Sequence, residues 1–159
     1  TLSVDVIAQK LQALQERYEI TLFILQEKSD SALKEALPDV RQCIWSPANM
    51  TIDAFMAELA QQDVLIASRA HGAICGACAG VPSVIVEIEP KLRRVHEMLG
   101  NSSVLIDDID AVDWHATIEK ARAISKAQLR EDVSANQQKA HQALAAFDAW
   151  CQTTGLLNG

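Results

Sequence analysis

Short apolar runs alternate with segments of helical periodicity along this sequence, and this alternation is what most limits how the chain can fold. The runs ITLFIL (20–25), DVLIA (63–67) and SVIVE (83–87) have strand length, and runs of this kind are typical of strands buried on both faces of a parallel sheet. Shorter strands are expected at 42–45 and 103–106. The predicted helices lie at 4–18, at 29–37, after the capping residue Thr51, at 73–79, from Pro90 to about Gly100, and over 112–149 as one or two helices.

Strands that alternate with helices through short loops predict an α/β fold with a parallel sheet flanked by helices. The chain has 159 residues, which suits one domain, and its 49% apolar residues are enough to form a core. We expect segment 112–150 to be a helical tail that packs on this domain. Because such sheets usually begin on a strand and this sequence begins on a helix, we also expect a first strand upstream.

Charge and cysteine content exclude several classes of function. The net charge of −7 argues against binding to nucleic acid or to anionic membranes. The four cysteines do not form a dense disulfide pattern, so a reducing cytoplasm is expected. No apolar run reaches the length of about 18 residues that a transmembrane helix needs, so neither a transmembrane helix nor a signal peptide is expected.

A cationic and a titratable side chain follow the apolar run 63–67. Ser68, Arg69 and His71 should lie at the carboxyl edge of the sheet, where ligands of α/β proteins bind. The helix that starts there offers unpaired N–H groups to an anion, and Gly72 allows a close approach. Arg69 suits a carboxylate or phosphate, and His71 can donate a proton near neutral pH. The alternative is a surface Arg69 with a capping or packing His71.

Two cysteines share a helical face with this histidine. His71, Cys75 and Cys78 follow one another at helical spacing, but a metal site needs three or four converging ligands. Because small buried cysteines are the better interpretation, no metal site is predicted.

A second group of charged residues follows the run 83–87, at the same sheet edge. Glu87 and Glu89 should point to the same side of an extended chain, and Lys91 follows them. One interpretation is that Lys91 binds an anionic group while Glu89 positions it or contacts a hydroxyl. The other is a solvated loop in which a glutamate caps the helix that Pro90 opens.

Three ordered blocks resemble the polysaccharide pyruvyl transferase family. They are Ser68-Arg69-Ala70-His71-Gly72, then Gly80-Val81-Pro82, then Ile88-Glu89-Pro90-Lys91. Members of that family typically show an S-R-L-H-G-like motif, a small-residue helix ending in G-V-P, a strand, and a Y-D-x-K-like segment. The resemblance covers about 51–100, and the first fifty residues agree in layout only. Ala70 replaces the usual leucine, and Ile88 stands where the family often has tyrosine.

The resemblance implies a fold and a reaction. The fold is glycosyltransferase-B-like, with two Rossmann-like halves, and residues 1–159 would form the C-terminal half as a single Rossmann-like domain. The reaction is transfer of a pyruvyl group from phosphoenolpyruvate to sugar hydroxyls, which forms a ketal on a cell-surface or exopolysaccharide precursor. This chain alone would be an incomplete and inactive part of the enzyme.

Residue roles and partners also follow from the resemblance. Arg69 would bind the carboxylate or phosphate of the donor and His71 would be the acid/base group, as the catalytic pair. Substrate-binding residues would be Ser68, Gly72, Glu89 and Lys91. The partners would be phosphoenolpyruvate, a glycan or lipid-linked sugar acceptor and the N-terminal half. Membrane association would occur only through the acceptor, and no cofactor or nucleic acid is expected.

Two other functions fit the same residues. The first is the nucleotide-sugar-binding half of a glycosyltransferase, in which Glu87 or Glu89 would contact a ribose. The second is a non-catalytic domain for glycan binding or assembly, which the Ile88 departure and the acidic surface allow.

Overall fold

The computed structural model describes residues 4–25 and 27–154. The chain forms parallel strands that alternate with helices, so the predicted α/β class with parallel strands flanked by helices is confirmed. The strands are β1 (Thr21–Ile24), β2 (Arg41–Ile44), β3 (Leu65–Ala67), β4 (Ser83–Val86) and β5 (Ser103–Ile106). The helices are α1 (Val4–Leu14), α2 (Glu27–Ala36), α3 (Ile52–Leu59), α4 (Ala70–Cys78), α5 (Pro90–Leu99), α6 (Trp114–Arg122) and α7 (Lys126–Thr154), with a 3₁₀ turn η1 (Gly100–Ser102) before β5.

The strands pair in two groups. One sheet has the order β1-β2 and the other has the order β3-β4-β5, and every pairing is parallel. All four residues of β4 are buried, as expected for a central strand with neighbours on both edges. Among the described residues, no strand pairing joins β1 to β3.

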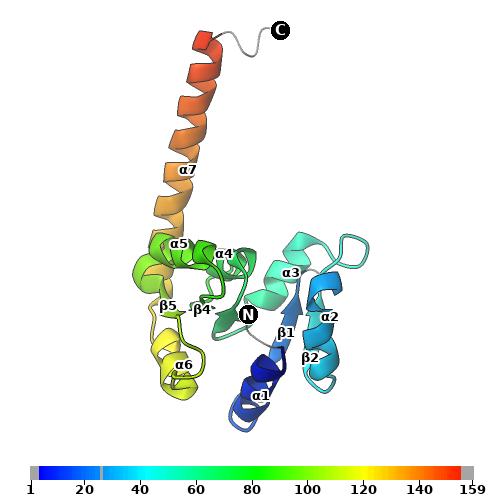
Figure 1. The fold of residues 1–159 in the computed structure, drawn as a ribbon. Coiled ribbons are helices and arrows are strands. Elements are labelled where there is room, and N and C mark those ends of the chain that lie inside the picture. Colours follow the sequence, from blue (N-terminus) through cyan, green and yellow to red (C-terminus); the bar gives the residue numbers. More distant parts are fainter. Residues whose placement is uncertain (1–3, 26, 155–159) are drawn as a thin grey trace.

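Helices cover both faces of each sheet, and alternate residues of the strands point to opposite faces (Figure 1). In β1, Leu22 packs in the cluster formed with α1 and α2, whereas Phe23 packs with α3. In β3, Ile66 packs toward α6, whereas Leu65 packs toward α4. The helices α1, α2 and α6 therefore lie on one face of the molecule, and α3, α4 and α5 lie on the other.

Local signals in the sequence fix several helix ends. The Thr51 side chain accepts a hydrogen bond from the Ala54 N–H at 3.2 Å, so the predicted N-cap of α3 is confirmed. Pro90 occupies the first turn of α5, as predicted. After α4, Gly80 has φ of 77°, and the Val81 N–H donates to Gly76 O at 2.8 Å. This 6→1 bond is that of a Schellman motif, so Gly80 ends the helix as predicted.

Replacing Thr51 with alanine should lower the free energy of unfolding by about 1 kcal/mol, because the N–H group that the cap satisfies loses its acceptor. Urea denaturation would measure the change. Thr51→Ser is the control, since a serine hydroxyl accepts the same bond and should leave the stability within about 0.5 kcal/mol of the parent. Equal losses for both variants would contradict the capping role.

Several helix boundaries differ from the prediction, and those of the first helix and of the helix after β3 bear on the site. The helix predicted over 4–18 ends at Leu14 and continues as turns, in which the Tyr18 N–H still donates to Leu14 O at 2.9 Å. The helix predicted at 73–79 begins earlier, at Ala70. Arg69 is already its extended N-cap residue, which brings His71 into the first helical turn.

The C-terminal segment forms two helices that behave differently. Helix α6 packs on β4 and β5, whereas α7 packs only through its first turns. Farther along α7, the Asn136 amide donates to Met98 O at 2.8 Å. Beyond it α7 extends away from the sheets (Figure 1), and Leu144 and Phe147 are 61% and 57% exposed. None of the described helices is both long and apolar enough to cross a membrane.

Candidate functional site

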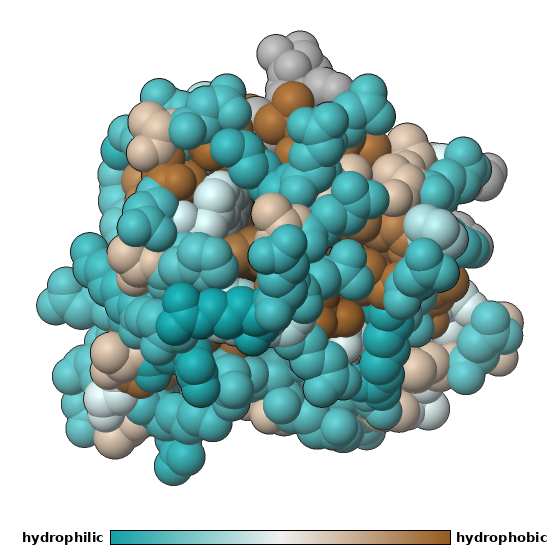
Figure 2. Space-filling view, turned by 90° about the horizontal axis from the view of Figure 1, so that it is seen from below, coloured by the Kyte–Doolittle hydropathy of each residue, from teal (hydrophilic) through white to brown (hydrophobic). Residues whose placement is uncertain are grey.

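A cavity of about 560 Å³ lies between the two sheets. Its walls are β1, β3, and the inward sides of α1 and α6. Ser68, Arg69 and Gly72 also line it, and they come directly after the carboxyl end of β3. Seen from below, on the side of α1 and α6 and away from the carboxyl ends of the strands, the surface is mostly polar, with apolar side chains visible in recesses between the polar ones (Figure 2). The predicted edge for ligand binding therefore lies at one end of this cavity.

Arg69 sits at the N-cap of α4 and forms an ion pair that crosses the cavity mouth. Its Nη2 donates to Oδ1 of Asp30, which belongs to α2 on the other side. The Asp30 side chain is 18% exposed and that of Arg69 is 43% exposed. Sequence analysis missed Asp30, because the two residues are 39 positions apart and no local pattern links them. The contact holds the guanidinium in place at the carboxyl edge of the sheet.

The first turn of α4 presents backbone donors beside Arg69. The helix-closing bond runs from the Ala73 N–H to Arg69 O at 3.2 Å, so the N–H groups before it have no carbonyl partner within the helix. A Cβ placed at Gly72 would meet no atom within 4 Å, so the space beside that residue is open. A cation, unpaired N–H groups and open space together suit a compact anion.

His71 is exposed in this first turn and does not line the cavity. Its ring makes no hydrogen bond or ion pair within residues 4–25 and 27–154. Arg69 and His71 are thus neighbours in the chain, with the arginine on the cavity wall and the histidine open to solvent.

Glu89 and Lys91 lie on the loop after β4 and at the start of α5, and neither lines the cavity. Lys91 Nζ is 2.9 Å from Glu89 Oε1 in an exposed ion pair. Glu89 is the N-cap residue of α5, but its side chain makes no capping bond, so the interpretation of a capping glutamate is wrong for this residue. Glu87 instead binds Arg93, whose Nε donates to Oε1 at 2.8 Å, and this hydrogen bond raises the pKa of Arg93.

Two thiols and one further histidine have structural surroundings, whereas Cys78, which was expected to be buried, is exposed. Burial raises the pKa of both the Cys43 and the Cys75 thiol, so neither is an activated nucleophile. His96 Nδ1 lies 2.8 Å from Ser103 Oγ, and burial followed by the Arg93 charge lowers the pKa of His96. In the part of the chain that the structure describes, no three His, Cys, Asp or Glu side chains converge in a group able to hold a metal ion.

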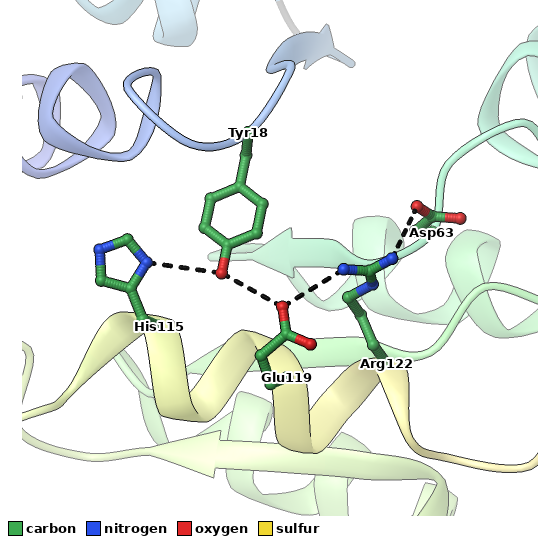
Figure 3. Close-up of polar contacts among 5 residues, drawn as sticks. All are labelled: Tyr18, Asp63, His115, Glu119 and Arg122. Atoms are coloured by element: carbon green, nitrogen blue, oxygen red, sulfur yellow. Dashed lines mark hydrogen bonds and ion pairs between the residues drawn. The ribbon is translucent and has the colours of Figure 1, made fainter.

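A polar cluster joins the two halves at the opposite end of the cavity, before β1 and β3 begin (Figure 3). The Tyr18 hydroxyl donates to Glu119 Oε1 at 3.3 Å and lies 3.4 Å from His115 Nδ1. Arg122 binds Glu119 at 3.3 Å and Asp63 at 3.6 Å. The His115 ring stacks on Tyr18 with centroids 5.6 Å apart. We call these five residues the Tyr18 cluster.

Comparison with known proteins identifies the family. The sequence model of the family described as polysaccharide pyruvyl transferase matches residues 4–90, which are 87 of the 159 residues. The match includes Ser68–Gly72 and Gly80–Pro82, ends one residue before Lys91, and reaches into the first fifty residues, where the motifs alone had shown only a common layout. The chain matches none of the curated proteins and none of the solved structures with which it was compared. By this match over more than half its length, the chain belongs to the polysaccharide pyruvyl transferase family.

Proposed function

We propose that this domain takes part in pyruvyl transfer from phosphoenolpyruvate to sugar hydroxyls, with the donor bound at the cavity mouth. The observation that carries this proposal is the position of Arg69, which lies on the cavity wall, at the N-cap of α4 and at the carboxyl end of β3. Phosphoenolpyruvate carries a carboxylate and a phosphate close together. A bidentate guanidinium and helical N–H groups are the donors that such a polyanion needs.

Ketal formation requires a proton donor and a proton acceptor. The methylene carbon of the donor takes up one proton while a first sugar oxygen bonds to the adjacent carbon, and the proton of that hydroxyl restores the proton donor. The bond between this carbon and the phosphate oxygen then breaks, a second sugar oxygen replaces the phosphate, and the proton of the second hydroxyl leaves with the phosphate. His71 delivers the first proton, because an imidazole exchanges protons near neutral pH and this one is open to the solvent side of the mouth.

The other residues and partners follow from this arrangement. Ser68 and Gly72 border the donor, whereas Glu89 and Lys91 lie outside the cavity and serve the acceptor. The acceptor is a glycan or lipid-linked sugar of exopolysaccharide or cell-surface biosynthesis, used on the cytoplasmic side of the membrane. A second, N-terminal half completes the glycosyltransferase-B-like cleft. Phosphoenolpyruvate enters as a substrate, and neither a cofactor nor nucleic acid takes part.

Thermal-shift titration with phosphoenolpyruvate tests the donor site. We expect the ligand to raise the Tm of the parent chain and to have a several-fold smaller effect on Arg69→Gln, because the charged hydrogen bonds are lost. Asp30→Asn keeps an acceptor for Arg69 and removes one negative charge, so phosphoenolpyruvate should bind it about two- to fivefold more tightly than the parent.

The controls for this titration are a second cation and a second ligand. Arg94→Gln makes the same charge change at an exposed position of α5 and should leave the shift unaltered. Uridine diphosphate is the ligand that the glycosyltransferase alternative predicts. Stabilisation by uridine diphosphate without any by phosphoenolpyruvate would count against pyruvyl transfer.

A further inference from the structure

We propose that one more β-strand occupies the cavity between β1 and β3. Its occupant is an extended apolar segment of polypeptide that runs parallel to both strands, leads into α1 and joins the two sheets into one. The argument rests on backbone geometry and on side-chain packing, and it does not depend on the reaction proposed above.

The free edges of β1 and β3 present backbone groups to the same cavity. Ile24 O accepts from the Trp45 N–H at 3.0 Å, so Ile24 faces β2, and the N–H and C=O of Phe23 face the opposite edge. Likewise the Leu65 N–H donates to Pro82 O at 3.0 Å, so the backbone groups of Ile66 point away from β4. Phe23 and Ile66 both line the cavity. Unpaired backbone groups in such a place are costly, and a strand between them would pair both edges.

The side chains of β1 and β3 are those of central strands. Both strands are apolar apart from Thr21, yet most of their residues are only half-buried, because their free edges border the cavity. The strand β2 has the composition of an outer edge, since Arg41 pairs with Glu58 at 2.7 Å and Gln42 is polar. Edges that natural proteins leave open usually carry such polar or charged residues. The strands β1 and β3 carry no charged residue and one polar residue, Thr21, as expected of edges that are covered.

The helices already lie where a single sheet would need them. Helices α1, α2 and α6 share one face and α3, α4 and α5 share the other. A strand in the cavity gives the order β2-β1-strand-β3-β4-β5, which is the 3-2-1-4-5-6 order of doubly wound sheets. In Figure 1, α1 begins near the gap between the sheets and runs down, and β1 runs back up. A strand that ascends in the gap would lead directly into α1.

The added strand would also complete the candidate site. In doubly wound sheets, ligands bind at the carboxyl ends of the strands where the strand order reverses, and the new strand occupies that point. Its carboxyl end would lie beside Ser68 and Arg69, which follow the carboxyl end of β3. The residues that follow the new strand would then form the remaining wall of the mouth.

Hydrogen exchange on an extended chain tests the proposal. An extension placed before Thr1 carries about five alternating valine and isoleucine residues, preceded by lysine and followed by serine and glycine. The matched control replaces two of the apolar residues with proline, which has no N–H to donate. We expect the extension to slow exchange of the Phe23 and Ile66 amides by about tenfold or more relative to the proline control, and to raise the Tm. The Ile85 amide in β4 is the internal reference and should not change. Equal exchange rates at Phe23 and Ile66 in the two extended proteins would overturn the proposal.

A second measurement uses the chain as it stands and needs no variant. If β1 and β3 paired directly, nuclear Overhauser effects would connect their backbone protons, because paired strands lie about 4.8 Å apart. If the cavity holds one strand, β1 and β3 lie about twice as far apart. Nuclear Overhauser effects between β1 and β3 should then be missing, whereas those between β3 and β4 should be present. Backbone contacts between Phe23 and Ile66 in this spectrum would refute the proposal, whatever the fate of the extended protein.

Discussion

Replacing His71 with alanine is expected to slow ketal formation by about 10²–10⁴-fold in the active pyruvyl transferase, the usual contribution of a positioned acid or base. The KM for phosphoenolpyruvate should change little, because in the proposed site Arg69 and the α4 amides, not His71, bind the donor. Arg69→Gln should show the opposite pattern, with a raised KM. Steady-state kinetics on both variants, with phosphate release as the readout, separate proton transfer from binding.

His71 lends itself to this experiment because its side chain is exposed, so its removal should alter stability by no more than about 0.5 kcal/mol. His141→Ala is the control, an exposed histidine on the projecting part of α7. Added imidazole should restore part of the rate to His71→Ala. An unchanged yield of pyruvylated product from that variant would instead favour a non-catalytic role for the histidine.

Gly76→Val is expected to lower the free energy of unfolding by about 3 kcal/mol, at the upper end of the cost of overpacking a core. The backbone of α4 approaches β3 and β4 closely at this residue. A Cβ added at Gly76 would lie 2.7 Å from Leu65 Cδ2 and 3.3 Å from Ser83 Oγ. Alanine would require only the end of the Leu65 side chain to move, so Gly76→Ala should cost less than valine. Urea denaturation of the two variants measures the order.

Gly72→Ala is the matched control, in the same helix and with open space around the new methyl group. It should be neutral or stabilising by up to about 1 kcal/mol, because alanine loses less backbone entropy in a helix than glycine. If alanine at Gly72 lowered the stability as much as alanine at Gly76 does, α4 would be equally sensitive to a larger residue at either glycine. That result would contradict the close-approach explanation.

Features encoded by neighbouring residues could be predicted from the sequence. The Thr51 cap, the Pro90 start of α5 and the Gly80 end of α4 each depend on residues a few positions apart, and all three were predicted. The earlier start of α4 was missed, because Arg69-Ala70-His71-Gly72 contains no side chain that caps a helix and the N-cap makes no such bond. A helix start of that kind is set by packing on the sheet, which a local pattern does not contain.

The candidate site was only partly accessible from the sequence for the same reason. The position of Ser68 and Arg69 directly after the run 63–67 predicted that they lie at the carboxyl edge, and both line the cavity there. Asp30 was missed because its link to Arg69 is a tertiary contact between two helices. The gap between β1 and β3 was also missed, since a run such as ITLFIL indicates a buried strand but does not say which neighbour buries it.

The chain passes between the two sheets once, through α3, and this has a consequence for the order in which the domain unfolds. Residues 4–44 form a unit of two strands and two helices, held to the rest by apolar packing on α3, by the Arg69–Asp30 pair and by the Tyr18 cluster. Exposed polar pairs contribute little, and a two-stranded sheet has little stability of its own. We therefore expect residues 4–44 to open first as a cooperative unit, while β3, β4 and β5 retain their structure.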